Sequence, residues 1–102
     1  VRGILSSIYV KLKTGVSIYK VQKELKSFYK KDQFIKVLKI NSAIGSGNVL
    51  NTNNCEISIC ATREKKKIVI FSAIDNLVKG AAGQAIQNMN LLCNYPTNFG
   101  LK

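Results

Sequence analysis

The sequence contains no histidine, so neither a Ser-His nor a Cys-His catalytic dyad can be assembled from this chain alone. Cysteine is also scarce. Only Cys55, Cys60 and Cys93 are present, and no two of them have the CxxC spacing of a structural zinc site, so we expect no metal site. An odd number of thiols in a Lys-rich chain fits a reducing cytoplasm, where each thiol acts as a small apolar group.

Acidic residues and long apolar runs are also in short supply. Five Asp and Glu stand against sixteen Lys and Arg, which gives a net charge of +11. That charge would attract polyanions, but the basic residues are mostly spread-out lysines, whereas phosphate and base recognition favours arginine. No apolar run approaches the roughly 18 residues needed to cross a bilayer, and no leader-like segment opens the chain. We expect a soluble, cytoplasmic protein that has no membrane partner.

At 102 residues the chain has the size of one domain. Its apolar content of 46% and charged content of 21% are close to the globular average, which argues against disorder, collagen-like repeats and coiled coils. It begins at Val1 rather than Met, as a piece of a longer protein would.

The first part of the chain has clear periodicities. Residues 4–12 alternate between two sets of positions, which predicts a strand with one drier face. Ser17 is a good N-cap for a helix over residues 18–29, where apolar positions recur at helical spacing opposite a lysine-rich side. The segment "FIKVLKI", residues 34–40, predicts a second strand.

The middle of the chain predicts a long loop and a hairpin. Residues 41–54 collect Asn, Ser and Gly over more positions than a plain connection needs, so we expect them to be either mobile or functional. The segments "CEISICAT" and "KIVIFSAI", joined by the charged "REKK", predict an antiparallel hairpin, after which Asp75 can cap a closing helix.

The resulting order, β-α-β-β-β-α without an internal repeat or linker, predicts an α+β fold in which helices cover a mixed, largely antiparallel sheet. One hypothesis is that an apolar face of this sheet pairs with a second copy of the chain. That face would comprise Ile4, Ile8, Val10, Ile57, Ile59, Val69 and Phe71.

The predicted closing helix contains two glycines, Gly80 and Gly83, on either side of two alanines. Each glycine inside a helix costs about 1 kcal/mol relative to alanine. Residues i and i+3 share a helix face, so the pair would present small residues against which another group packs closely. A cofactor ring or phosphate near the helix start and the helix's own sheet both fit this pattern.

The run "DNLVKGAAGQAIQNMNLL", residues 75–92, closely resembles the closing segment of N-acetyl-gamma-glutamyl-phosphate reductases, the NADP-dependent enzymes of arginine biosynthesis, and more distantly that of aspartate-semialdehyde dehydrogenases. The opening "RGIL", residues 2–5, is similar to the strand that follows the family's catalytic histidine segment. "TNNCEI", residues 52–57, resembles the family's loop-to-strand stretch. The three segments occur in the family's order and at about its spacing, so the resemblance covers essentially the whole chain.

The resemblance implies a fold like the C-terminal domain of glyceraldehyde-3-phosphate dehydrogenase. Residues 1–74 would be part of the catalytic and dimerisation domain, and residues 75–102 a closing helix and tail that pack on a Rossmann domain absent from this chain. The family's Gly-rich NADP loop, its thioacyl-forming cysteine and its acid/base histidine are not in this chain. The chain would therefore hold no catalytic residue and be inactive alone, whereas the full-length enzyme would be a homo-oligomer acting on a small-molecule substrate.

The resemblance also implies site residues, because the family's closing helix lies beside the nicotinamide end of NADP. The candidate cofactor-binding residues are Asn76, Lys79, Gly80 and Gly83. Arg2 is a candidate substrate-binding residue, since a guanidinium holds a carboxylate or phosphate in two-point fashion. Asn53 is a second candidate, since an amide can hold an acyl or acetamido group.

Two competing interpretations concern short motifs. "CNYPT", residues 93–97, is similar to the family's Gly-Cys-Tyr-Pro-Thr nucleophile motif, but an Asn intervenes and the segment follows a helix, so we interpret Cys93 as an ordinary thiol. The alternative function is a small basic RNA-binding module of the KH type, since "GAAG" is a GxxG. A KH-type GxxG lies in a loop between two helices with basic neighbours, whereas this one falls inside a single predicted helix, which argues against nucleic acid as a partner.

Overall fold

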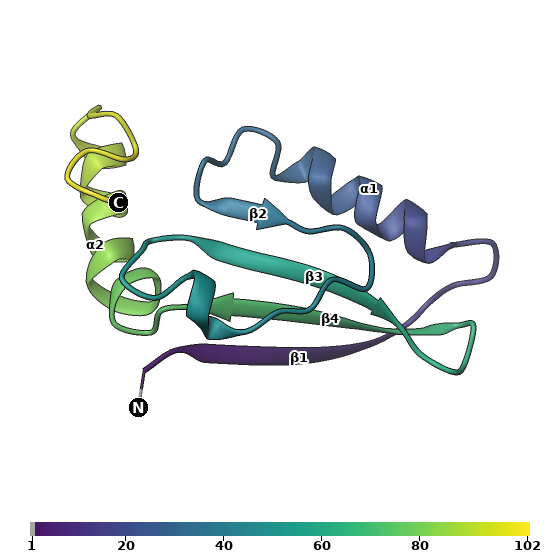
Figure 1. The fold of residues 1–102 in the computed structure, drawn as a ribbon. Helices are drawn as coiled ribbons and strands as arrows, with labels where there is room; N and C mark the ends of the chain where they lie inside the picture. Colours follow the sequence, from purple (N-terminus) through teal and green to yellow (C-terminus); the bar gives the residue numbers. More distant parts are fainter. Residues whose placement is uncertain (1) are drawn as a thin grey trace.

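The computed structural model describes residues 2–102, and its elements follow the predicted order. The strands and helices are β1 (Ile4–Lys11), α1 (Ile18–Phe28), β2 (Ile35–Val37), β3 (Cys55–Ala61), β4 (Lys67–Ile74) and α2 (Gly83–Leu92). The strands form one sheet in the order β1-β4-β3-β2, in which β2 runs parallel to β3 and the other pairs are antiparallel. The predicted α+β class with a mixed, largely antiparallel sheet is therefore confirmed (Figure 1).

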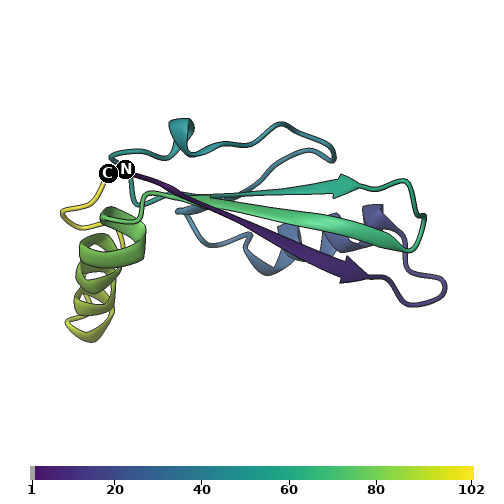
Figure 2. The same cartoon turned by 90° about the horizontal axis from the view of Figure 1, so that it is seen from below.

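Helix α1 covers one face of the sheet (Figure 2). It begins where the sequence predicts, since the Ser17 hydroxyl accepts a hydrogen bond from the Lys20 backbone N–H at 3.2 Å. Its apolar side packs against a buried cluster in the sheet. That cluster consists of Leu12, Ile59 and Ile68, with Val10, Val16, Ile18, Val21, Leu25 and Ile70 packed against it.

Residues 41–54, which we call the central loop, cross the opposite face of the sheet (Figure 2). At the start of this loop the Ser58 hydroxyl donates to the carbonyl of Ser42 at 2.6 Å, and the Asn41 side chain accepts a hydrogen bond from the backbone at the end of β3 at 2.9 Å. Val49, just after a short 3-10 turn, is fully buried. The loop is thus an anchored layer over the sheet.

The sheet register corrects the expected apolar face. Ile59 pairs with Ile70 and Phe71 pairs with Ser58, and directly paired residues share a face while successive residues alternate. Phe71 and Val69 therefore lie on the face opposite to Ile59. The expected set mixed the two faces because the relative register of separate strands is not visible in one strand's alternation.

The closing segment also differs from the single helix that the sequence predicts. A π-helical turn (Val78–Ala82) comes first, and α2 begins only at Gly83. Within this turn, Gly80 N donates to the Asp75 carbonyl at 3.1 Å and Ala82 N to the Leu77 carbonyl at 3.3 Å, both with i→i−5 spacing. Asp75 is therefore not an α-helical N-cap.

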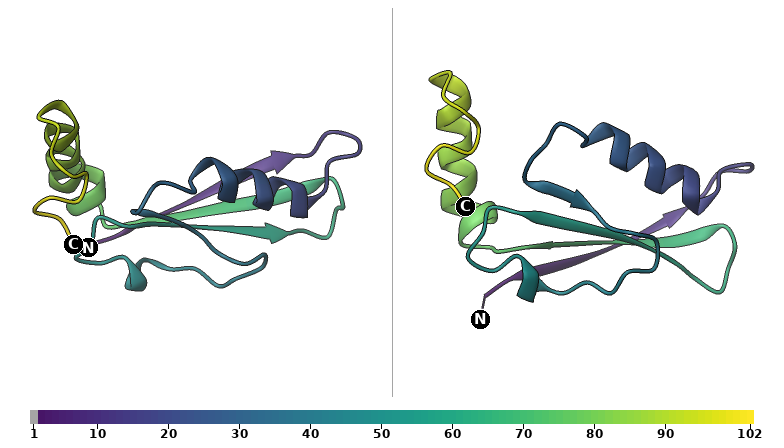
Figure 3. Two further views of the ribbon diagram at one scale, coloured as in Figure 1. Left: turned by 90° about the horizontal axis from the view of Figure 1, so that it is seen from above. Right: turned by 45° about the horizontal axis from the view of Figure 1, so that its top comes forward.

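Helix α2 lies beyond the end of the sheet and does not cover a face of it (Figures 1 and 3). The chain after α2 folds back along it: the Asn90 side-chain amide donates to the carbonyls of Thr97 and Phe99, each at 3.0 Å. The final carbonyl, of Lys102, accepts a hydrogen bond from Asn53 N at 3.0 Å. The tail thus returns to the end of the central loop.

Candidate functional site

The sheet register brings three segments of the chain together at one end of the sheet. Ile4 of β1 lies opposite Ile74 of β4, so the residues before β1 meet those after β4. Cys55 at the start of β3 lies opposite the same Ile74, so the end of the central loop reaches this place too. In agreement, Gly3 N donates to the Asn76 side-chain oxygen at 2.7 Å.

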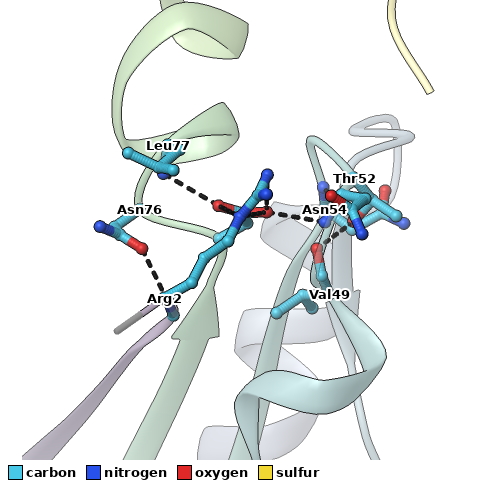
Figure 4. Close-up of polar contacts among 9 residues, drawn as sticks. Arg2, Val49, Thr52, Asn54, Asn76 and Leu77 are labelled. Carbon is cyan, nitrogen blue, oxygen red and sulfur yellow. Dashed lines mark hydrogen bonds and ion pairs between the residues drawn. The ribbon is translucent and has the colours of Figure 1, made fainter.

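The carboxylate of Asp75 lies at the centre of this junction and is fully buried. Arg2 donates from Nε to Oδ2 at 2.9 Å and to Oδ1 at 3.1 Å, and its Nη2 lies 2.8 Å from Oδ2. The backbone N–H groups of Asn51 (2.7 Å) and Leu77 (2.9 Å) also donate to it. Figure 4 shows Arg2 and Leu77 reaching this carboxylate from different segments. We call these four residues the Asp75 cluster.

The electrostatics of the Asp75 cluster favour the ionised acid. The side-chain hydrogen bond from Arg2 is the main cause that lowers the pKa of Asp75 from 3.8 to about 2, and the N–H groups of Asn51 and Leu77 act in the same direction. Burial opposes this change but is outweighed. Asp75 is therefore a fixed anion at neutral pH that orients the Arg2 guanidinium.

A second network joins the central loop to α2. Asn53 is fully buried, and its side-chain nitrogen donates to Gln87 Oε1 at 2.9 Å. Lys79 Nζ donates to the same Gln87 oxygen at 2.9 Å and lies 5.4 Å from the centre of the Phe34 ring. Partial burial lowers the pKa of Lys79, against the attraction of Cys55 and Asp32. Gln87 thus holds two of the candidate residues at one oxygen.

The two glycines have different surroundings. A Cβ on Gly83 would lie against Asn53 Oδ1 and at 2.7 Å from the Val78 carbonyl oxygen, so this glycine permits close approach of the loop to the start of α2. A Cβ on Gly80 would meet the end of the Ile74 side chain at 3.3 Å, and Gly80 is exposed. Gly83 is in close contact with the central loop and the π turn. The sequence had suggested either a cofactor or the sheet as the group that packs against it.

The structure thus places all six candidate residues at or beside this one end of the sheet. Sequence reasoning missed the roles of Asp75 and Gln87. The sequence contained one indication that Asp75 is part of the site: it is one of only five acidic residues, and it immediately precedes the candidate Asn76. The signal for Gln87 was its place among the amides of an otherwise small and apolar helix, which could be either solvated or hydrogen-bonded at an interface.

The other features of the described residues that bear on function are the thiols, the absence of a metal-ligand group within residues 2–102 and the character of the helices. The thiol of Cys55 is buried and lies 3.3 Å from the Ser72 hydroxyl, and Cys93 is exposed just after α2. Within residues 2–102, no group of three metal-ligating side chains is assembled. None of the helices in this part of the chain has the length and apolar content to cross a bilayer.

The fold is an α+β domain with a mixed four-stranded sheet, and the Asp75 cluster lies at one end of that sheet. Residues 1–76 match the family model described as semialdehyde dehydrogenase, dimerisation domain. The chain belongs to this family.

Within this family the chain is similar to N-acetyl-gamma-glutamyl-phosphate reductases. The N-acetyl-gamma-glutamyl-phosphate reductase of Clostridium botulinum (strain Eklund 17B / Type B) is 46% identical over 98% of this chain and 29% of its own length. The reductases of the same name from Halothermothrix orenii and Desulfotalea psychrophila are 48% and 42% identical, each over 99% of this chain and 29% of the relative. The chain therefore spans less than a third of these relatives, and it corresponds to their C-terminal part.

A solved structure supports the fold. Aspartate semialdehyde dehydrogenase II from Vibrio cholerae, determined as a complex with ASA, matches with a TM-score of 0.65 over 91% of this chain and 27% of that chain. At 14% sequence identity, this likeness concerns the fold alone. This likeness in fold is consistent with the expected resemblance to the C-terminal domain of glyceraldehyde-3-phosphate dehydrogenase.

Proposed function

We propose that this chain is the C-terminal part of an NADP-dependent reductase that converts N-acetyl-gamma-glutamyl phosphate to N-acetylglutamate semialdehyde and phosphate in arginine biosynthesis. The observation that carries the proposal is the similarity to reductases of that name, at 40–48% identity along nearly all of this chain. The reaction belongs in the cytoplasm, where the three free thiols would stay reduced. The RNA-binding alternative has no support from these relatives.

The proposed division of labour puts the nucleophile, the acid/base histidine and the nucleotide loop in the missing N-terminal portion. Residues 1–74 contribute to the catalytic and dimerisation domain, and residues 75–102 pack on a Rossmann domain. Exposed apolar side chains near and along α2 suit such packing, since Leu77, Leu91 and Leu92 are 55%, 59% and 85% exposed. The isolated chain should show no turnover.

The cofactor-facing residues would be those around the π turn. The Lys79 ammonium is a half-buried cation suited to an anionic group, and among the described residues no hydrogen bond occupies Asn76 Nδ2. Gly80 is exposed and leaves room for a flat group, while Gly83 would act through packing on Asn53. When bound, NADPH supplies the hydride for the reduction.

The substrate-facing residues would be Arg2 and Asn53. Arg2 is 39% exposed at its side chain and is held by Asp75, so an anionic substrate would meet a guanidinium that is already oriented. Asn53 Oδ1 finds no hydrogen-bond partner within residues 2–102 but is fully buried against Gly83, so a donor such as an acetamido N–H could satisfy it only where the central loop moves away from α2.

A chimera tests the proposed function. The C. botulinum relative keeps its N-terminal part and receives this chain in place of its own C-terminal part. We expect phosphate-dependent reduction of NADP by N-acetylglutamate semialdehyde, the reverse reaction, and no turnover by this chain alone. Arg2→Lys should reduce this activity in the chimera, whereas Arg63→Lys in the exposed β3–β4 hairpin should not. A chimera that folds and binds NADP but has no activity, beside an active parent enzyme, would contradict the proposal.

A further inference from the structure

Glu56 is a buried acid without a matching cation. Of the five acidic residues, Asp75 pairs with Arg2 and Glu64 with Lys67. The other three form no ion pair within residues 2–102 although the chain carries a net charge of +11, and of these Glu24 and Asp32 are exposed whereas Glu56 is buried. Glu56 is 8% exposed, and its Oε1 is shielded from solvent and has no hydrogen-bond partner in that range. Such a carboxylate is costly to bury unless a partner compensates its charge.

The sheet register places one residue on either side of Glu56 in β3. In the sheet register it lies opposite Ala73 of β4, which is fully buried and offers only a methyl group. On the other side it lies opposite Lys36 of β2, which is exposed. The two side chains share a face of the sheet, yet no ion pair forms between them.

A pocket opens at this place. It has a volume of about 450 Å³ and is lined by Glu56, Lys36, three residues that carry amides and the apolar Phe34 and Ile35. The amides come from Gln33, Asn48 and Asn54. The pocket therefore offers a negative group, a positive group and neutral hydrogen-bonding groups within one small volume.

We propose that this pocket binds a small zwitterion of the amino-acid type, with the ligand's ammonium on Glu56, its carboxylate on Lys36 and its remaining polar atoms on the amides. A primary ammonium supplies the N–H donors that the Glu56 carboxylate lacks. A Ca²⁺ or Mg²⁺ ion is a poorer match, because it takes six or more oxygen ligands and Lys36 would repel it.

Three matched probes test the site on the 102-residue chain by amide chemical-shift titration. β-Alanine carries both charges, ethylammonium only the positive one and propionate only the negative one. We expect saturable shifts at residues 36 and 54–56 with β-alanine, weaker binding of ethylammonium and the weakest binding of propionate. Glu56→Gln should weaken β-alanine binding by about tenfold or more, as expected for the loss of a charge-assisted hydrogen bond. The control Glu64→Gln should not change it.

The exposed Lys36 provides a second variant in case Glu56→Gln does not fold. Lys36→Gln should remove the preference for β-alanine over ethylammonium while leaving the fold intact. The proposal is overturned if β-alanine gives no saturable shifts at the pocket, if Glu56→Gln binds it unchanged, or if Lys36→Gln keeps the preference.

Discussion

The Arg2 guanidinium binds Asp75 and is also the group that we propose to bind the substrate. Its Nε and Nη2 are used by Asp75, so a two-point grip on a substrate anion through that edge would have to displace a buried carboxylate. The remaining N–H groups are the ones available to a ligand. Asp75 is thus a positioning residue for Arg2, and we expect its loss to disturb both the stability of the junction and the orientation of the guanidinium.

The pH dependence of stability follows from the lowered pKa of Asp75. A carboxyl whose folded-state pKa is about 2, below its ordinary 3.8, contributes stability above pH 3.8, and this contribution is lost as pH falls toward 2. We expect the urea midpoint of unfolding to fall over that interval. In Asp75→Asn the midpoint should be lower at neutral pH and the acid-dependent fall shallower. Glu64→Gln, which removes only an exposed ion pair, should keep the wild-type profile.

Gly83 and Gly80 should respond oppositely to alanine. In Gly83→Ala the new methyl meets the fully buried Asn53 and the Val78 backbone, so we expect a loss of about 1–3 kcal/mol in the free energy of unfolding. Gly80→Ala meets only the flexible end of Ile74 and should be neutral or stabilising by up to about 1 kcal/mol. Chemical denaturation of both variants measures the difference, and an equally tolerated Gly83→Ala would show that the loop does not pack on α2.

At the scale of elements, α2 is a helix with little packing on the sheet and no buried apolar side chain. It lies beyond the sheet, and of its residues only Gly83 and Asn90 are buried. Its stability therefore depends on the polar contacts of Asn53 and Gln87 and on the tail that folds back along it.

Hydrogen exchange should reveal this difference. We expect the amides of residues 75–92 to exchange about tenfold or more faster than those of β3 and β4, because few buried apolar contacts resist local opening of the closing segment. In the chimera, where the missing domain is present, the same amides should slow down. Equal protection of α2 and the central strands in the isolated chain would contradict this prediction.

The element order and the start of α1 could be predicted because they depend on local patterns: alternation, helical spacing and a serine N-cap. The second strand was predicted over residues 34–40 but spans only Ile35–Val37. Beyond it the chain still donates to β3, from Leu38 N to the Ile57 carbonyl and from Asn41 N to the Ile59 carbonyl, but without the regular spacing of a strand. Asp75 and Gln87 could not be assigned, since their partners come from segments far away in the sequence. The lack of an ion pair at Glu56 could not be predicted either, because it depends on which residues of β2 and β4 the sheet register places beside Glu56.

At the scale of the whole molecule, the edge strand β1 leaves apolar groups uncovered on both faces of the sheet. Ile4 and Ile8 are 44% and 48% exposed on the face that α1 partly covers, and Leu5 and Tyr9 are 50% and 81% exposed on the other. An edge strand with such side chains invites a partner. A second copy of the protein is the partner that we propose, in keeping with a family named for dimerisation.

Tyr9→Asp should weaken self-association by placing a charge on this exposed strand. We expect the sedimentation coefficient of the wild-type chain to rise with concentration and that of Tyr9→Asp to rise less. Tyr19→Asp is the matched control, because Tyr19 is similarly exposed at 72% but lies on α1. A wild-type chain that stays monomeric, or equal effects of the two variants, would argue against association through β1.

The pairing of β1 with β4 also has a consequence for biosynthesis. Among the strands of residues 2–102, β1 pairs with β4 alone, and its first residue, Ile4, pairs with Ile74. A ribosome must therefore translate the whole stretch from Ile4 to Ile74 before this pair can form, and contacts between such distant residues form slowly. During this interval β1 lacks its β4 partner in the nascent chain, so we expect chaperones that protect unpaired strands to bind it.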